Sequence, residues 1–213
     1  MSRKQTNQSN PKLKDRRAEE RDQRRQSILD AALTLFAKQG YTETKLTEIA
    51  EAARLGKATL YYYFPEKETI YWTIYEEETI RYYERVSDAI LSTEDPAEII
   101  SLYFRQYINY GYENTDFLKI IFPLGKSSPM GSARHREIGE KVDDHRKPID
   151  EHLNSVLEKN QSPLSGPELT ELIWTMLSGL SIKIIRGAQY SAVVLEAQIF
   201  IDSLNSIIQG ETA

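Results

Sequence analysis

The segment ARLGKATLYYYFPEKE, from Ala53 to Glu68, gathers residue types that can bind phosphate. Gly56 and Lys57 stand before Thr59, and a Gly-Lys pair followed by a hydroxyl residue is typical of the loop that binds nucleotide phosphates. That loop needs the spacing GxxxxGK(S/T) between a strand and a helix, whereas Lys57 is followed by Ala58 and preceded by a helical pattern. A nucleotide-binding loop is therefore not expected here.

The histidines are the other residues that could support chemistry. His145 and His152 lie seven residues apart, on one helical face, with Asp144 and Glu151 nearby. A metal site needs three or four converging ligands, and the intervening Pro148 disturbs this spacing. The chain has no cysteine, which excludes thiol chemistry and disulfides, and it has no nucleophile–base motif. We therefore expect no metal, no cofactor and no enzyme, with an all-α enzyme that uses the His145/His152 region as the weaker alternative.

Charge is distributed unevenly along the 213 residues, whose net charge is −5. Residues 1–67 hold 14 Lys and Arg against 9 Asp and Glu, a net charge of +5. The remaining residues hold the other 13 basic and 23 acidic side chains, a net charge of −10. This asymmetry is typical of a chain whose basic end meets a polyanion, although a basic tail on an ordinary acidic domain would produce it too.

Neither a membrane span nor an export signal is expected. No apolar run approaches the roughly 18–20 residues that cross a bilayer. The N-terminal stretch MSRKQTNQSNPKLKDRR has no apolar core of a signal peptide. Together with the absence of cysteine, this indicates a cytoplasmic protein with no membrane partner.

Helical periodicity dominates the chain. Apolar residues recur at three- and four-residue steps, and no stretch alternates with period two for long enough to form a sheet. Capping signatures, with Pro at the first turn and Glu three residues after the cap, stand at Asp95 and Ser165. We predict an all-α fold of about nine helices, with a flexible basic arm (1–15), a basic three-helix domain (16–67) and a larger, acidic helical domain (68–213). The expected helices are 16–39, a short one capped by Thr44, 57–64, 65–91, 96–112, 117–122, 133–159 with a kink or restart at Pro148, 166–186 and 191–209.

The opening segment is better explained as the second helix of a helix-turn-helix. On a helix that begins near Lys57, Leu60 and Phe64 share a face that can pack inward. The tyrosines then lie around the rim, where phenol hydroxyls can donate to phosphate oxygens. A short helix, a tight break and a second short helix place that second helix in the major groove of DNA.

The segment ILDAALTLFAKQGYTETKLTEIAEAARLGKATLYYYFPEKETI resembles the N-terminal DNA-binding domain of TetR-family transcriptional repressors. Its most specific elements are Gly40-Tyr41, Thr44, Ile49-Ala50 and the run from Thr59 to Phe64 before Lys67-Glu68. The resemblance covers about residues 24–70. It implies that Lys57, Ala58 and Tyr62 face base edges, that Thr44, Thr59, Tyr61, Tyr63 and Lys67 hold phosphates, and that Phe36, Ile49, Leu60 and Phe64 are core.

Three positions depart from the family pattern. Arg54 replaces the usual turn glycine, and it is either a strained turn residue or an added phosphate contact. Gly56 replaces the serine that caps the second helix, a change that costs only a few tenths of a kcal/mol. Lys45 stands where a small hydroxyl residue is common, and we expect it to contact phosphate rather than only solvent.

Two C-terminal helices carry apolar stripes that could pair with a second copy. The resemblance implies that these helices form a four-helix dimer interface, so that two helix-turn-helix units meet half-sites of a palindrome. Packing of the same stripes into the chain's own core is the alternative, and the two are compatible. The predicted interface residues are Ile173, Leu177, Leu180, Ile184, Val194, Ala197, Ile201, Leu204 and Ile208.

The middle of the chain is rich in aromatic residues. Most of them suit an ordinary core, but as a set they could line an apolar ligand pocket with a few polar groups. The predicted pocket residues are Tyr103, Phe104, Tyr107, Tyr110, Phe117, Phe122 and Trp174, with Arg105 as a partner for an anionic head group.

We therefore expect a homodimeric repressor that binds a palindromic double-stranded DNA operator and releases it when an apolar, aromatic or acyl small molecule binds. An architectural or non-specific DNA-binding protein without an effector is the main alternative. Residue patterns alone favour a repressor over an activator only weakly, and they name neither the operator nor the effector.

Overall fold

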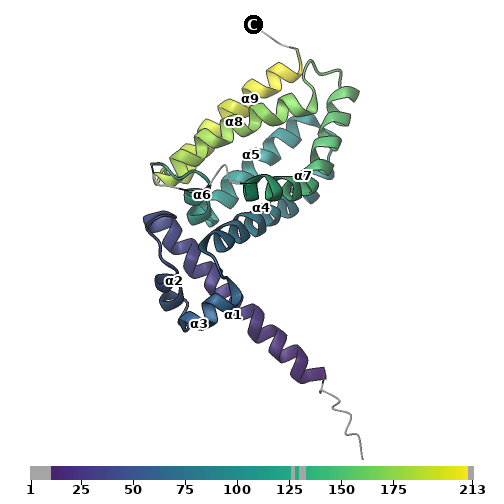
Figure 1. Ribbon diagram of the computed structural model, residues 1–213. Helices are drawn as coiled ribbons and strands as arrows, with labels where there is room; N and C mark the ends of the chain where they lie inside the picture. Colours follow the sequence, from purple (N-terminus) through teal and green to yellow (C-terminus); the bar gives the residue numbers. More distant parts are fainter. Residues whose placement is uncertain (1–10, 126–127, 130–132, 211–213) are drawn as a thin grey trace, which may run out of the picture.

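The computed structural model describes residues 11–125, 128–129 and 133–210. Over these residues the chain forms nine α-helices and no strand (Figure 1), which confirms the all-α prediction. Ser127 and Gly131 of the predicted loop before the seventh helix lie outside the described residues. The helices are α1 (Pro11–Gln39), α2 (Leu46–Ala52), α3 (Lys57–Tyr63), α4 (Lys67–Leu91), α5 (Pro96–Glu113), α6 (Thr115–Ile121), α7 (Ala133–Lys159), α8 (Gly166–Ile185) and α9 (Tyr190–Ile208).

The first helix is longer than predicted. α1 begins at Pro11 rather than at Arg16, so it includes five residues that were expected in the flexible arm. Proline at the first helical position costs no hydrogen bond, because its missing N–H would have no partner there. Residues 1–10 of the predicted arm lie outside the described residues.

Helices α1, α2 and α3 form one end of the molecule, and α4 runs from this end into the bundle made by α5 to α9 (Figure 1). The three N-terminal helices pack around Phe36, Ile49 and Leu60, which are at most 2% exposed. Phe64, directly after α3, is also buried. These are the core residues that the resemblance implied, and their burial fixes α3 on the surface of this end. The boundary between residues 67 and 68 stays a prediction.

The start of α2 differs from the prediction. Lys45 rather than Thr44 is the N-cap residue, and its backbone N–H donates to the Glu48 carboxylate at 2.8 Å. The Thr44 hydroxyl instead donates to the carbonyl oxygen of Gly40 at 2.8 Å. Thr44 is therefore used to close the loop between α1 and α2.

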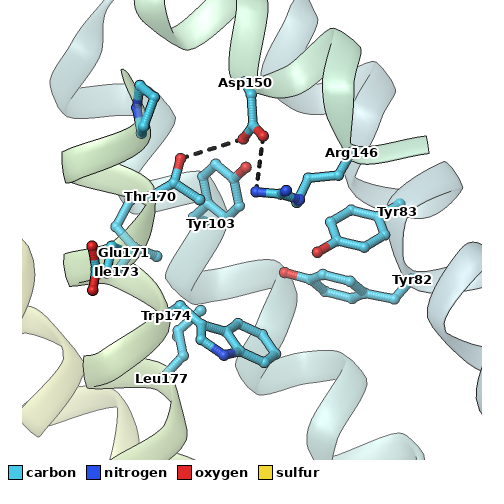
Figure 2. Close-up of a pocket in the computed structure, with 11 residues that line it drawn as sticks. Tyr82, Tyr83, Tyr103, Arg146, Asp150, Thr170, Glu171, Ile173, Trp174 and Leu177 are labelled. Carbon is cyan, nitrogen blue, oxygen red and sulfur yellow. Dashed lines mark hydrogen bonds and ion pairs between the residues drawn. The ribbon is translucent and has the colours of Figure 1, made fainter. Parts of the chain in front are cut away.

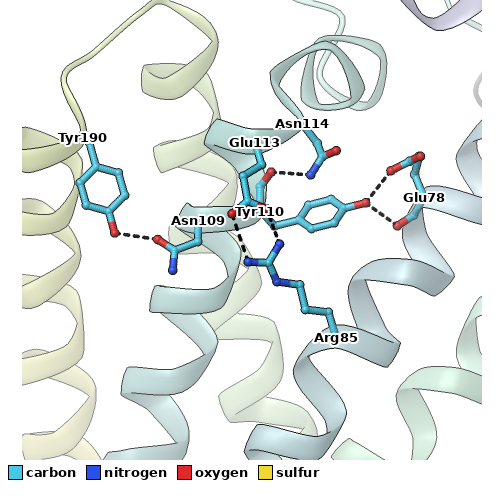
Figure 3. A network of polar contacts seen from close by, with 7 residues as sticks. All are labelled: Glu78, Arg85, Asn109, Tyr110, Glu113, Asn114 and Tyr190. Carbon is cyan, nitrogen blue, oxygen red and sulfur yellow. Dashed lines mark hydrogen bonds and ion pairs between the residues drawn. The ribbon is translucent and has the colours of Figure 1, made fainter. Parts of the chain in front are cut away.

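A polar network joins α4 to α5 in the bundle (Figure 3). The Tyr110 hydroxyl donates to the carbonyl oxygen of Glu78 at 2.9 Å and to its carboxylate at 2.6 Å. Arg85 of α4 pairs with Glu113 of α5 near the surface, where an ion pair adds little stability. Burial and the Glu78 carboxylate raise the pKa of Tyr110 well above its usual range, so the phenol stays a donor.

Two further expectations concern the long helices. Pro148 lies inside α7, and Figure 1 shows that this helix changes direction in its middle rather than restarting after a loop.

α9 is long and apolar enough to cross a membrane by length and composition alone, so the expectation that no segment reaches that limit was wrong. A core helix passes the same test, and α9 buries Val193, Ala197 and Leu204 in the bundle.

The turn between α2 and α3 holds Arg54 in a left-handed conformation, with φ of 57°. The N–H of Leu55 bonds to the carbonyl of Ala50 at 2.9 Å, and the N–H of Arg54 to that of Glu51 at 3.0 Å. This pair of bonds is the Schellman motif, in which glycine is the usual left-handed residue. Arg54 is therefore a strained turn residue, which was one of the two alternatives offered by the sequence.

We expect Arg54→Gly to raise the free energy of unfolding by about 0.5–1 kcal/mol. Glycine removes the steric penalty of the left-handed backbone, and its larger loss of conformational entropy on folding cancels part of that gain. Urea unfolding of the two proteins measures the change. Ala52→Gly, in the last turn of α2, is the control and should lower stability by about 0.5–1 kcal/mol. A loss of stability in Arg54→Gly would show that its side chain makes a stabilising contact.

Candidate nucleic-acid interface and ligand cavity

Helix α3 presents an exposed polar and aromatic surface. Tyr61 and Tyr62 are 49% and 79% exposed, while Leu60 beneath them is 1% exposed. Lys57 and Ala58, in the first turn, are also exposed. A large aromatic side chain that is four-fifths exposed on a seven-residue helix is unusual in a free protein, because it gains nothing from burial there.

The predicted base contacts are all exposed, whereas the predicted phosphate contacts range from exposed to buried. Lys57, Ala58 and Tyr62, the predicted base contacts, all lie exposed on α3. Thr44 is only 1% exposed and its hydroxyl already has an acceptor, so the side chain offers no donor at the surface. Among the other predicted phosphate contacts, Lys45 and Tyr61 are exposed, and Thr59, Tyr63 and Lys67 are half-buried.

Lys67, the first residue of α4, clamps the loop between α1 and α2. Its ammonium donates to the carbonyl oxygens of Tyr41 at 2.7 Å, Thr42 at 3.2 Å and Thr44 at 2.8 Å. It also lies 4.4 Å from the centre of the Tyr41 ring. An ammonium has three N–H donors, and these three bonds use all of them. A phosphate contact by Lys67 would have to replace one of them, and that role stays a proposal.

Burial and charge act in opposite directions on Lys67. Burial lowers the pKa of its ammonium, and the nearby carboxylates of Glu43 and Glu48 raise it. The three carbonyl oxygens favour the charged form, since they accept hydrogen bonds that are shorter and stronger from a cation.

A cavity of about 420 Å³ lies in the bundle between α4, α5, α7 and α8. Figure 2 shows the hydroxyl groups of Tyr82 and Tyr83 pointing toward its middle, with Trp174 on one side and Arg146 on another. The walls combine aromatic rings, an ion pair and aliphatic side chains. The lining residues are Tyr82, Tyr83, Tyr103, Arg146, Asp150, Pro167, Thr170, Glu171, Ile173, Trp174 and Leu177.

Some polar groups at the cavity wall have hydrogen-bond partners and others have none. The hydroxyls of Tyr82 and Tyr103 are buried and have no hydrogen-bond partner among the described residues. Asp150 is satisfied, because it pairs with Arg146 at 2.9 Å and accepts from Thr170 at 3.4 Å. Burial raises the pKa of Asp150, and Arg146 opposes that rise. Two unpaired buried phenols each cost about 1–3 kcal/mol, which a ligand with suitable acceptors would recover.

The sequence-based pocket overlaps the cavity at only Tyr103 and Trp174. The Tyr107 hydroxyl lies 2.6 Å from Ser181 Oγ, and that of Tyr110 is held by Glu78. Arg105 is exposed. Phe104 and Phe117 are buried, Phe122 is half-buried, and none of the three lines the cavity.

Nine of the eleven residues that line the cavity were missed by the pocket prediction. Tyr82 and Tyr83 stand in the aromatic α4, which the sequence marked only as a run of aromatic residues. Arg146 and Asp150 are four residues apart on α7, a spacing that also suits any exposed helical ion pair. Only the packing of α7 against α4 brings this pair to the cavity wall.

The predicted dimer stripes face inward in the single chain. Eight of the nine residues are at most 7% exposed, and only Val194, at 40%, is accessible to a partner. The periodicity therefore identified the core face of each helix. The large apolar and aromatic residues left exposed on α8 and α9 are Leu172, Trp174, Tyr190, Val194, Leu195 and Ile199.

The histidines do not converge. His152 lies 2.8 Å from the carbonyl oxygen of Thr93, whereas His145 is exposed near Pro148. Within the part of the chain that the structure describes, no three His, Asp or Glu side chains gather as a metal site would require. Neither His145 nor His152 lines the cavity.

Replacement of Lys67 by methionine should lower the free energy of unfolding by about 2 kcal/mol, because three carbonyl oxygens lose a charged donor while the apolar stem is kept. Urea unfolding measures the loss. Lys45→Met, which removes an exposed ammonium from the same end of the molecule, should change stability by less than about 0.5 kcal/mol. Equal effects of the two substitutions would argue against the clamp.

Tyr103→Phe should raise the free energy of unfolding by about 1 kcal/mol, because it removes a buried hydroxyl that has no partner. Tyr107→Phe is the matched control. It removes a hydroxyl that is bonded to Ser181, and it should lower stability by about 1 kcal/mol. Thermal unfolding of the ligand-free protein distinguishes the two, and destabilisation by Tyr103→Phe would mean that its hydroxyl is already satisfied.

Known proteins resemble this chain most strongly at the end that carries α1 to α3. The profile of the family "Bacterial regulatory proteins, tetR family" matches residues 28–71. The negative transcriptional regulator IcaR of the Staphylococcus aureus biofilm operon is 48% identical over 44 residues, 21% of this chain and 24% of IcaR. The uncharacterised regulator YuxN of Bacillus subtilis is 31% identical over 87 residues, 41% of this chain and 28% of YuxN. The chain thus spans about a quarter of the length of these relatives.

Solved structures resemble the whole chain. A candidate fatty acid metabolism regulator from Clostridium perfringens has a TM-score of 0.65 and 25% identity, over 88% of this chain and 98% of that one. FadR of Bacillus subtilis in complex with stearoyl-CoA has a TM-score of 0.65 and 19% identity, over 87% and 98% of the two chains, which shows the fold alone. The proteins that match in sequence are transcriptional regulators. Residues 28–71 therefore carry the domain of the tetR family of bacterial regulatory proteins, and the chain has the fold of regulators solved in that family.

Proposed function

We propose that the protein is a cytoplasmic, homodimeric repressor that binds a palindromic operator and releases it when a small molecule fills the cavity. One observation carries this proposal. The single helix α4 supplies two residues of the cavity wall, Tyr82 and Tyr83, and its first residue, Lys67, holds the loop that leads into the helix-turn-helix. A displacement of α4 would therefore act on both ends of the molecule.

DNA binding is assigned to α3. Lys57, Ala58 and Tyr62 are proposed to face base edges in the major groove, since they are exposed at the helix that a helix-turn-helix inserts there. Tyr61 and Lys45 are proposed to hold backbone phosphates beside it, with Thr59 and Tyr63. The buried Thr44 and the clamped Lys67 are proposed to act by fixing the loop geometry, with direct phosphate contact as the lesser role.

Dimerisation is assigned to the exposed face of α8 and α9. Leu195 and Ile199 are 69% and 60% exposed, and with Val194 they form an apolar patch on α9. Burial of such a patch against a second copy is favourable by about 25 cal/mol per Å². A twofold axis there would present two α3 helices to half-sites about 34–36 Å apart.

The proposed effector is an apolar, aromatic or acyl molecule. A volume of about 420 Å³ lies within the roughly 300–1,000 Å³ of ordinary ligand sites, and the unpaired phenols of Tyr82 and Tyr103 would orient an acceptor group. The similarity to FadR, which was solved with stearoyl-CoA, supports the acyl class. An effector releases DNA only if it binds the non-binding state more tightly than the operator-binding state.

Substitutions in α3 should separate base contacts from phosphate contacts. Lys57→Ala should relax the preference at particular operator positions, whereas Tyr61→Phe should weaken binding to all duplexes equally. Binding of each variant to a wild-type-selected duplex and to its single-base variants measures the difference. A uniform loss in Lys57→Ala would make Lys57 a backbone contact, and binding without any sequence preference would favour the architectural alternative.

Stearoyl-CoA, free stearate and coenzyme A should be compared as effectors. We expect an acyl ligand to raise the thermal midpoint and to release the selected duplex, with the shift reduced in Tyr103→Phe, because that variant keeps the cavity but loses a donor. Tyr107→Phe is the control and should respond as the wild type does. If none of these ligands, nor a panel of apolar aromatic molecules, stabilises the protein or releases DNA, the effector proposal fails.

A further inference from the structure

The N-terminal half of α1 leaves the body of the protein. Residues 11–27, which we name the α1 stalk, span about 25 Å at 1.5 Å per residue. Figure 1 shows this half of α1 continuing beyond α2 and α3. None of the side chains from Asp15 to Ser27 is buried, and the first buried residue of the helix is Ile28. Packing inside the chain therefore does not account for the stalk.

One face of the stalk is basic. Arg17, Arg21 and Arg24 follow one another at steps of four and three residues, so they share a face of the continuous helix. The same steps lead on to Ile28 and Ala32, both 0% exposed in the core of the α1–α3 end. The face that is buried in the second half of α1 thus becomes an arginine face where the helix leaves the body.

Three of the four acidic residues of the stalk lie on the opposite side, and the fourth, Glu20, lies beside the arginine face and pairs with Arg16 at 3.1 Å. Asp15, Glu19 and Asp22 also follow steps of four and three residues, but they are offset by about half a turn from the arginine face. The contact between Arg21 and Asp22 is 3.7 Å long and exposed, and neither Arg17 nor Arg24 has an ion-pair partner among the described residues. The arginines are therefore free to bind an external anion.

The stalk leaves the body of the protein close to the end of α3. The guanidinium of Arg25 lies 5.9 Å from the centre of the Phe64 ring and pairs with Glu77 of α4. Phe64 directly follows α3. A duplex that meets the exposed Tyr61 and Tyr62 of α3 would therefore pass near the stalk.

We propose that Arg17, Arg21 and Arg24 form a second DNA-binding surface, which holds backbone phosphates of the duplex that α3 contacts. The proposal rests on the proposed DNA-binding function. Charge identifies DNA as the partner of this surface, because a duplex carries one negative charge per about 1.7 Å and the planar guanidinium can bind two phosphate oxygens at once. A protein partner is disfavoured, since Ala18 is the only apolar side chain described in the stalk.

The test uses the full chain and the duplex that wild-type protein selects from a random-sequence library, with ten base pairs on each side. The variant Arg17→Gln, Arg21→Gln, Arg24→Gln keeps helix-compatible side chains and removes three charges. The control Arg134→Gln, Arg136→Gln, Lys147→Gln removes three exposed charges from α7. Fluorescence anisotropy from 50 to 200 mM salt gives the affinity and its salt dependence, and circular dichroism and sedimentation give helicity and oligomeric state.

The stalk variant should bind at least about tenfold more weakly at 100 mM salt, with a slope of log K against log[salt] smaller by about five, since a dimer would lose about six phosphate contacts, while the control stays close to wild type. Sequence preference should be unchanged. Equal slopes in the stalk variant and the wild type would overturn the proposal, and so would a changed oligomeric state with an unchanged slope. Failure of wild-type protein to select any duplex would instead overturn the proposed function.

Discussion

The structure depends on the burial of aromatic side chains where α4 passes between the two ends of the molecule. Tyr71 and Trp72 are at most 1% exposed, and the Tyr71 ring lies 5.7 Å from that of Phe36 in α1. The Tyr71 hydroxyl donates to the carbonyl of Ile120 in α6 at 2.8 Å. One side chain of α4 thus contacts the N-terminal end by its ring and the bundle by its hydroxyl.

This junction links the cavity to the helix-turn-helix through a single helix. The α4 helix carries Lys67, Tyr71 and Tyr82 in order, from the loop clamp through the aromatic junction to the cavity wall. Close-packed interiors transmit displacement because they have no free volume to absorb it. At the cavity end of α4 the Tyr82 hydroxyl has no hydrogen-bond partner among the described residues, whereas at the other end the Lys67 ammonium donates three hydrogen bonds.

Much of the fold follows from local pattern, and the errors have local causes. Asp95 and Ser165 cap the starts of α5 and α8 as predicted. In each case a side-chain oxygen accepts a hydrogen bond from a backbone N–H of the first turn, and a proline in that turn favours the helical backbone angle. The early start of α1 was missed because the stalk has no apolar stripe to mark it. The pocket was misplaced because α5 shows aromatic residues on several faces, and periodicity does not say which face meets α8 and which meets a cavity.

The sequence by itself determined the helices, the helix-turn-helix and the outward tyrosines of α3, since these depend on residues within a few turns of one another. Only the tertiary structure decided which hydroxyls are satisfied. Tyr103 and Tyr107 are four residues apart on α5, yet one phenol is unpaired at the cavity and the other lies 2.6 Å from Ser181, which is 74 residues away. The same holds for Lys67, whose three acceptors lie 23 to 26 residues earlier in the chain. Partners so distant are set by how helices pack, and no local pattern encodes that packing.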